Sequence, residues 1–314
     1  MTKKIAITGA LGHIGSKLIH SSLLANSNIE EIRLIDNFLT QRYSSLFNLP
    51  EDIRYKFFEE DINSTDLDIL FKDIDIVVHL AAITDAASSF GNQKEIEVVN
   101  FEGTNKVMNA CINNGCKLVF LSSTSIYGSN KDNIDADSGE EDVNPQSPYA
   151  ESKYQSEKIL NNLSKDNDLD FCILRLGTIF GPSIGMRFHT AVNKFCWQAN
   201  FDKPITVWSS ALHQKRPYLG INDAISAIYF IIENDLFKKD TFDVVTQNFS
   251  VNDVINILKE IYKSLRIEFI DSEIMNDYSF SVSAKKIRDL GMIFKDDLQK
   301  QIKETSKLLK NNNL

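Results

Sequence analysis

The chain has 314 residues, of which 43% are hydrophobic. This length exceeds the size at which a single hydrophobic core usually stops growing, so we expect one large domain and a smaller second one. The 34 basic and 43 acidic residues give a net charge of -9. Nucleic acids and anionic membranes attract proteins of the opposite charge, so we expect neither as a partner.

The cysteines and the apolar runs also exclude several classes. The four cysteines form no CxxC pair and no zinc-type spacing with histidine, so we expect reduced, mostly buried thiols and no metal site. The opening run MTKKIAITGA is too short for the core of a signal peptide, and no apolar run approaches the roughly 20 residues that span a bilayer. We therefore expect a cytoplasmic protein.

The first two-thirds of the chain alternates short apolar runs with longer segments of helical period. The expected strands are Lys4–Thr8, Glu31–Asp36, Arg54–Glu59, Asp75–Leu80, Lys117–Ser122 and Phe171–Leu176. The expected helices are Ile14–Asn26, Asp66–Lys72, Gln93–Asn114 and Pro148–Leu163. This alternation predicts an α/β fold of the Rossmann type, with a doubly wound parallel sheet.

The remainder predicts a smaller C-terminal α/β domain that binds the substrate. The alternation weakens after Leu176, where FGPSIGMRF begins a mixed region. A helix over Asn222–Glu233 and the strand-like TFDVVT then return the chain to the first sheet. We therefore expect the first domain at 1–176 plus about 222–246, and the second at about 177–221 plus 247–314.

A glycine-rich turn follows the first strand. Gly9, Gly12 and Gly15 lie in TGALGHIGS, where the strand passes into the first helix. Small residues there let the backbone approach a pyrophosphate, which the helix N-terminus then binds. Glycines also occur in turns for structural reasons alone. We expect His13 and Ile14 to line the same site.

Two aspartates strengthen the prediction of a dinucleotide site. Asp36 ends the second strand, where a carboxylate would accept hydrogen bonds from the adenosine ribose and repel a 2′-phosphate. NAD is therefore favoured over NADP, although Asp36 could also just begin a surface turn. Asp61 follows the third strand and could bind the adenine amine or serve only in a loop. Asn37 and Ile62, beside them, are expected to contact the cofactor too.

Three tyrosines precede a lysine by four residues: Tyr127 and Lys131, Tyr149 and Lys153, and Tyr154 and Lys158. In a helix this spacing places both side chains on one face, so the ammonium can lower the pKa of the tyrosine toward neutrality. The first pair runs into Gly128 and polar turn residues, which disfavours a helix.

Tyr149 has the best position of the three for catalysis. It follows Ser147 and Pro148, a typical cap and first-turn residue, and so lies at the mouth of a helix. Tyr154 is five residues further on and points elsewhere on that helix, which favours a packing role. The fifth strand ends in LSSTSIYG, so its hydroxyls lie at the ligand-binding edge of the sheet and could hold a substrate oxygen.

These segments together resemble the extended short-chain dehydrogenase/reductases, in particular the NAD-dependent sugar epimerase/dehydratase family, which includes UDP-glucose 4-epimerase. The resemblance rests on TGALGHIGS, LID, HLAA, VVNFEGT, LSSTSIYG, SPYAESK and LRLGTIFGP, and it covers nearly the whole chain. It implies NAD as cofactor and a nucleotide sugar as substrate.

The resemblance also assigns roles. Ser123 takes the place of the catalytic Ser/Thr, Tyr149 acts as acid and base, and Lys153 orients the tyrosine and the nicotinamide ribose. Arg216 is similar to an arginine that binds the substrate diphosphate, although it could be a surface arginine. The remaining cofactor residues implied are Leu80, Ala81, Ala82 and Asn100.

Several departures limit the choice of reaction. Thr124 and Ser125 replace the acidic pair of the family's 4,6-dehydratases, and Ser125 also replaces the glutamate of decarboxylating members, so both reactions are disfavoured. Thr178 stands where many epimerases have asparagine, and Thr84 where some members have a longer polar side chain. Both are expected at the substrate together with Thr124.

We expect a nucleotide-sugar epimerase that forms a transient keto sugar and restores the hydride to its opposite face. The alternatives are a keto-sugar reductase or dehydrogenase that exchanges its cofactor, and a non-catalytic dinucleotide sensor. The resemblance further implies a homodimer formed by the helices at Gln93–Asn114 and Pro148–Leu163.

Overall fold

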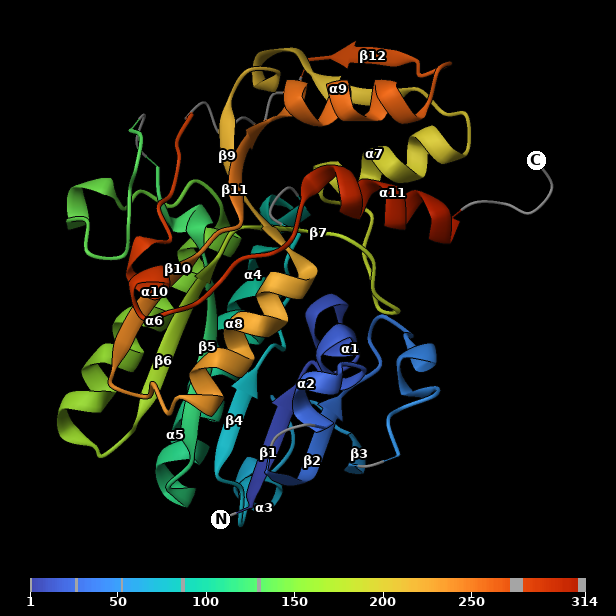
Figure 1. The fold of residues 1–314 in the computed structure, drawn as a ribbon. Helices are drawn as coiled ribbons and strands as arrows, with labels where there is room; N and C mark the ends of the chain where they lie inside the picture. The colour runs from blue at the N-terminus through green and yellow to red at the C-terminus, as the bar shows by residue number, and fades with distance from the viewer. Residues whose placement is uncertain are drawn as a thin grey trace.

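The computed structural model describes residues 2–25, 28–51, 53–85, 88–128, 131–271 and 279–309. Its largest element is a seven-stranded sheet in the order β10-β6-β5-β4-β1-β2-β3 (Figure 1). Every neighbouring pair in this sheet is parallel. The strands are β1 (Lys3–Thr8), β2 (Ile29–Asp36), β3 (Arg54–Glu59), β4 (Ile76–His79), β5 (Lys117–Ser123), β6 (Phe171–Leu176) and β10 (Asp240–Val244).

The predicted doubly wound fold is confirmed. The strand order reverses between β1 and β4, and in such sheets ligands bind outside the carboxyl ends of the strands at that point. The segment TFDVVT forms β10 beside β6, as expected from the sequence.

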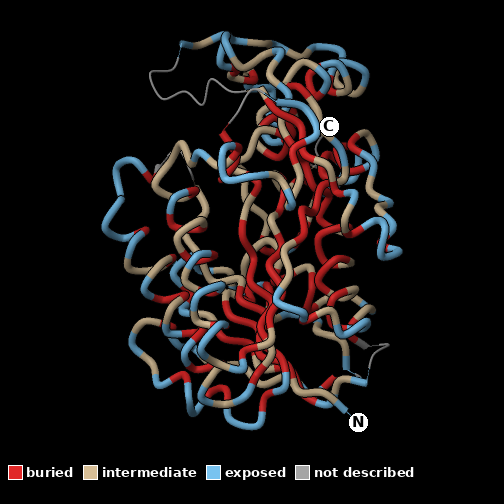
Figure 2. The backbone as a smooth tube through the Cα atoms, turned by 90° about the vertical axis from the view of Figure 1, so that its left-hand side faces the viewer, coloured by how far each residue is buried: buried red, intermediate tan, exposed pale blue. Residues whose placement is uncertain are grey.

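Helices cover both faces of the sheet (Figure 1). On one face lie α1 (His13–Ile19), α2 (Ser22–Ala25) and α8 (Ile221–Glu233), and on the other lie α3 (Leu67–Phe71), α5 (Gly103–Asn114) and α6 (Pro148–Asp166). Ile5 and Ile7 pack into the first layer and Ala6 into the second, so a strand needs apolar residues at successive positions. Figure 2 shows the buried residues concentrated along this sheet.

Two predicted helices are interrupted. The first ends at Ile19, because the Ser21 hydroxyl donates to the Leu18 carbonyl at 2.9 Å and competes with the helical hydrogen bonds. Asn26, its predicted end, lies outside the described residues. The helix predicted over Gln93–Asn114 contains a π-helical segment, Glu97–Glu102, between α4 (Gln93–Ile96) and α5.

The smaller part of the molecule lies beyond the carboxyl edge of the large sheet (Figure 1). It contains a sheet of order β11-β9-β7 and a β12-β8 pair. Its elements are β7 (Thr178–Phe180), α7 (Ala191–Asn200), β8 (Ile205–Trp208), β9 (Lys215–Gly220), β11 (Gln247–Ser250), α9 (Val251–Ile261), β12 (Ile267–Ile270) and α11 (Leu298–Leu309). The short helix α10 (Lys285–Asp289) packs on β10 of the large sheet.

Among the described residues, 3-10 helices lie in the connections at Tyr43–Leu46, Ser88–Phe90, Thr124–Ile126, Glu140–Asp142 and Ser209–Ala211. In the part of the chain that the structure describes, no helix combines the length and the apolar character that a membrane span requires.

Candidate active site

A cleft of about 700 Å³ separates the carboxyl edge of the large sheet from the smaller part. Loops after β1, β2, β3, β4 and β5 line it on one side, and residues of β7, β8 and β9 on the other. All the residues predicted from the sequence to bind cofactor or substrate line this cleft, except Asn100.

The glycine-rich turn forms the floor of one end of the cleft. Gly9 has a φ of +66°, and a Cβ atom there would lie 2.6 Å from the backbone nitrogen of Ala81. A Cβ atom on Gly15 would lie 2.5 Å from the Ala10 carbonyl oxygen. Side chains at either position would push the β1 turn away from its neighbours, so the glycines are needed for the close packing of this turn.

Polar groups at the ends of β2 and β3 surround the same end of the cleft. Asp36 accepts hydrogen bonds from the backbone amides of Leu11 at 3.1 Å and Phe38 at 3.0 Å, which fixes its carboxylate beside the glycine turn. The Asn37 amide donates to the Asp61 carboxylate at 2.9 Å. Ile62 also lines this end. These positions match those expected for binding the adenosine half of a dinucleotide.

Two arginines that the sequence analysis did not identify also line the cleft, Arg42 and Arg187. Burial lowers the pKa of Arg42 to about 10, and the charge of Arg187 acts in the same direction, while Asp36 opposes it. The Arg42 Nη1 atom is buried and has no hydrogen-bond partner within the described residues. An anionic group such as a diphosphate would satisfy this guanidinium, so the residues present fit a dinucleotide.

A segment from the smaller part crosses the first turn of α1, and we call residues 181–185 the strap. The His13 ring Nε2 lies 2.9 Å from the Gly181 carbonyl oxygen, and the Ser183 hydroxyl donates to the His13 carbonyl at 2.9 Å. The Gly185 amide donates to the Ser16 hydroxyl at 2.9 Å. Burial lowers the pKa of His13 to about 4, so its neutral ring can donate to Gly181.

Ser123 and Tyr149 meet where β5 ends and α6 begins. The Ser147 hydroxyl accepts from the Ala150 amide at 3.1 Å and, with Pro148, starts α6 so that Tyr149 lies in its first turn. The side chains of Tyr149 and Ser123 are hydrogen-bonded to each other. Ser123 also accepts from the Ser125 amide at 3.2 Å, which leaves its hydroxyl proton free to donate.

Lys153 follows Tyr149 by one turn and is only 3% exposed. Its Nζ atom lies 5.0 Å from the centre of the Phe120 ring. Burial lowers the pKa of Lys153 to about 8, and the negative charge of Glu157 opposes this. The ammonium can therefore lose its proton at mildly alkaline pH.

The expectation that Lys153 lowers the pKa of Tyr149 does not hold in this structure. Burial raises the pKa of Tyr149 above its ordinary value, because the anionic form would lose its hydration. The groups that oppose this are the Ser123 hydrogen bond and the charge of Arg187. Arg187 is thus an additional cation beside the predicted base.

The other two tyrosine–lysine pairs are elsewhere. Tyr127 is completely buried outside the cleft, and Lys131 instead forms an ion pair with Asp142 at 2.6 Å. Lys158 lies over the Tyr154 ring, with its Nζ atom 4.2 Å from the ring centre. Tyr149 is the tyrosine of the three that lines the cleft.

The far end of the cleft contains the residues predicted for the substrate. The Arg187 Nη1 atom donates to the Thr84 hydroxyl at 2.5 Å. Thr178 begins β7, and Arg216 lies in β9. The Arg216 guanidinium is 5.2 Å from the centre of the Phe280 ring, and Trp208 lines the same end.

Asn100 is completely buried behind the cleft, in the π-helical segment. Its side-chain oxygen accepts from the Ile83 amide and its side-chain nitrogen donates to the Ile83 carbonyl, both at 2.8 Å. It also lies 3.4 Å from the Ser152 hydroxyl on α6. Asn100 therefore ties the loop after β4 to the helices instead of touching a ligand in the cleft.

Comparisons with known proteins identify the family of the chain. Residues 5–244 match the model of the NAD dependent epimerase/dehydratase family. A Bacillus subtilis protein described as the uncharacterized UDP-glucose epimerase YtcB is 26% identical, over 97% of this chain and 98% of its own. The ADP-L-glycero-D-manno-heptose-6-epimerase of Brachyspira hyodysenteriae is also 26% identical, over 85% of this chain and 83% of its own.

Solved structures show the same relationship. The UDP-glucuronic acid 4-epimerase from Bacillus cereus, in complex with UDP-glucuronic acid and NAD, superposes with a TM-score of 0.87 at 26% identity, and 98% of each chain is covered. A mutant of that enzyme in complex with NAD and a fluorinated substrate analogue gives a TM-score of 0.89 at 27% identity, over 98% of each chain. The chain is therefore an NAD-dependent enzyme of the epimerase/dehydratase family.

Proposed function

We propose that the protein is an epimerase of nucleotide sugars, which inverts one carbon of the sugar without net oxidation or reduction. Tyr149 would remove the proton from a sugar hydroxyl, which the Ser123 hydroxyl holds by a hydrogen bond. NAD, when bound, supplies the acceptance and return of a hydride. Lys153 would orient the nicotinamide ribose through its ammonium, while the Ser123 hydrogen bond and the charge of Arg187 would favour the tyrosinate.

The choice of an epimerase rests on the contacts of the strap. Four hydrogen bonds, three of them 2.9 Å and one 3.2 Å long, join it to His13 and Ser16 in the first turn of α1. A reductase or dehydrogenase must exchange its cofactor in every turnover, whereas an epimerase regenerates it in place. These bonds would hold fixed the turn that is predicted to bind the diphosphate, which favours retention of NAD and therefore the second type of reaction.

The hydroxyl side chains next to the predicted base also favour an epimerase, because they disfavour a dehydratase. Thr124 and Ser125 lie at the end of β5, and the Thr124 hydroxyl donates to the Leu176 carbonyl at 3.2 Å. The Ser125 Oγ atom is buried without a hydrogen-bond partner within the described part of the chain. Neither hydroxyl can transfer a proton near neutral pH as a dehydratase requires.

We further propose a uridine diphosphate sugar with an acidic group as substrate. Arg187 carries its charge beside Tyr149 and binds Thr84, so it would lie close to the reacting sugar. Arg216 would bind the diphosphate, and Thr178 would contact the sugar. The Bacillus cereus relative, whose structure contains UDP-glucuronic acid, supports this choice.

The test is native mass spectrometry of the purified protein, followed by turnover of a panel of nucleotide sugars. We expect NAD to remain bound through purification, and UDP-glucuronic acid to be converted to its 4-epimer faster than UDP-glucose without added cofactor. Turnover that occurs only with added NAD(P)H would instead favour the reductase. Binding of NAD without any turnover would favour the sensor.

We also propose a homodimer and a cytoplasmic location. A groove of about 550 Å³ runs between α4, the π-helical segment and α6, and it is lined by Phe90, Phe101 and Pro145 among others. Burial of this groove against a second copy would join the four helices that the family resemblance implies. Light scattering at micromolar concentration should give twice the mass of 35.6 kDa. The four cysteines are free thiols, as expected in a reducing compartment.

A further inference from the structure

Four buried polar side chains form a continuous chain behind the cleft, and we call them the Arg175 network. Arg175 binds Glu157 through Nε at 3.1 and 3.2 Å and through Nη2 at 2.6 Å. Its Nη1 atom donates to the Tyr127 hydroxyl at 2.7 Å. That hydroxyl donates in turn to the Asp243 carboxylate, whose oxygens lie 3.0 and 3.1 Å away.

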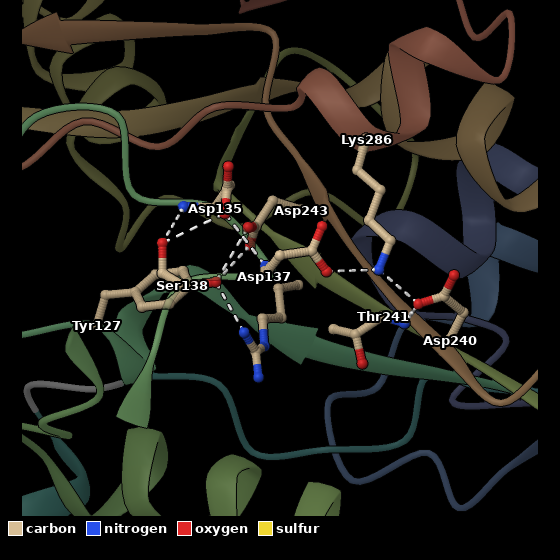
Figure 3. Close-up of polar contacts among 9 residues, drawn as sticks. Tyr127, Asp135, Asp137, Ser138, Asp240, Thr241, Asp243 and Lys286 are labelled. Carbon is tan, nitrogen blue, oxygen red and sulfur yellow. Dashed lines mark hydrogen bonds and ion pairs between the residues drawn. The ribbon is translucent and has the colours of Figure 1, made fainter. Parts of the chain in front are cut away.

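The register of the sheet brings these residues together. Arg175 on β6 is paired with Ser122 of β5 on one side and with Asp243 of β10 on the other. Figure 3 shows Tyr127 and Asp243 directed toward each other. The Arg175 side chain is 11% exposed, and Tyr127, Glu157 and Asp243 are at most 2% exposed.

The charges of the network are not balanced by its own members. Two carboxyl groups share one guanidinium, so the network carries an excess negative charge once Asp243 is ionised, above its pKa of about 7. A buried charge without a partner is strongly destabilising. Lys153 precedes Glu157 by four residues on α6, so the two side chains lie on the same face of the helix. Lys153 is itself buried, and its charge completes the balance.

We propose that Glu157 is a positioning residue, which the Arg175 network holds in place so that Lys153 stays protonated and directed toward the cleft. The role in turnover rests on the proposed function, whereas the effect on the protonation of Lys153 does not.

The other titratable groups around Lys153 do not supply the negative charge that Glu157 provides. Burial raises the pKa of Tyr149, which disfavours the anion that could take the place of Glu157. Burial lowers the pKa of His79 on β4 to about 3, so this histidine is neutral near pH 7. Asp243 is further along the network, and burial raises its pKa to about 7, with Glu157 and Asp135 acting in the same direction and Arg175 opposing.

The test is an NMR titration of the Lys153 side chain in protein with ¹³C-labelled lysine, where the signal is assigned by its loss in Lys153→Met. In Glu157→Gln, which keeps the shape and loses the charge, we expect the titration midpoint to fall by about one pH unit. Asp166→Asn is the matched control, because it removes an exposed carboxylate from the same helix about 20 Å away. It should leave the midpoint unchanged.

An unchanged midpoint in folded Glu157→Gln protein overturns the proposal. If that variant does not fold, Asp243→Asn is titrated instead, since the amide oxygen can still accept from Tyr127. Without the charge of Asp243, the Arg175 guanidinium repels the Lys153 ammonium more strongly. The midpoint should therefore fall, although by less than in Glu157→Gln, and an unchanged midpoint again overturns the proposal.

The kinetic readout is the pH profile of the catalysed reaction. The alkaline decline of kcat should move to lower pH in Glu157→Gln by the same amount as the midpoint, while KM is little changed. A shifted midpoint in a protein that converts no nucleotide sugar would keep the positioning role and reject the proposed function.

Discussion

Substitution of Gly185 by alanine should release NAD. A Cβ atom at this position would lie 2.3 Å from the Leu11 carbonyl oxygen and 2.7 Å from that of Gly12. A normal carbon–oxygen contact is about 3.3 Å, so the strap has to move by roughly 1 Å. Both opposing atoms belong to the backbone of the glycine-rich turn, which cannot move aside without disturbing the cofactor site.

The expected size follows from the contacts that this movement breaks. The four hydrogen bonds between the strap and α1 contribute about 1 kcal/mol each, so loss of two or three of them would weaken the hold of the strap on the glycine-rich turn by about 2–3 kcal/mol. Since 1.4 kcal/mol corresponds to a factor of ten, NAD should dissociate roughly 30 to 140 times more readily.

The assay is the fraction of protein that retains NAD after dialysis, measured by native mass spectrometry, together with the need for added NAD in turnover. Gly115→Ala is the control. Gly115 has a φ of +65° at the end of α5 and no atom within 4 Å of its Cβ position, so the substitution costs stability without touching the strap. If Gly185→Ala retains NAD as well as the unaltered protein, the strap does not hold the cofactor.

Further predictions concern the proposed catalytic and structural residues. Tyr149→Phe should lower kcat by about 100-fold or more while NAD stays bound. The control Tyr154→Phe should leave both kcat and NAD binding unchanged. If Tyr149→Phe is as active as the unaltered protein, proton transfer by Tyr149 is excluded. Arg187→Met should slow the turnover of UDP-glucuronic acid much more than that of UDP-glucose, and an equal loss for both would argue against a contact with the acidic group. Because the pKa of Lys153 is lowered to about 8, kcat should fall as the pH rises through this value and the ammonium is lost; a flat profile from pH 7 to 9.5 would contradict this. Asp223→Ala should lower the free energy of unfolding by about 2–3 kcal/mol in urea titrations. The substitution removes three hydrogen bonds that the Asp223 carboxylate accepts, from the Thr246 hydroxyl after β10 and from the backbone amides of Lys295 and Asp296 after α10.

Local patterns in the sequence were sufficient to predict the sheet. The strand Phe171–Leu176 has the predicted bounds, because a nearly continuous apolar run is required where helices cover both faces. The edge strand Arg54–Glu59 also has the predicted bounds, although none of its residues is fully buried. The π-helical segment at Glu97–Glu102 was not predictable from such patterns. Asn100 in this segment bonds to Ile83 in the loop after β4, and such a contact between a loop and a helix is not visible in a local periodicity.

The cleft was predicted in part for a similar reason. Gly9, Asp36 and Tyr149 occupy positions that short motifs specify relative to strands and helices. Arg42 and Arg187 belong to no such motif, and they reach the cleft only because the loop after β2 and the segment after the strap fold back over it. The FGPSIGMRF stretch marked where this segment begins, but it did not indicate which of its side chains faces inward.

The strap also has a consequence for how the enzyme would relate to the metabolism around it. If the strap retains the cofactor as proposed, a bound NAD would stay isolated from the free pool. Under the proposed cycle, the rate of such an enzyme would not follow the cell's ratio of oxidised to reduced NAD. Sugar conversion would then continue at the same pace in well-aerated and oxygen-starved cells, limited by the supply of nucleotide sugar alone.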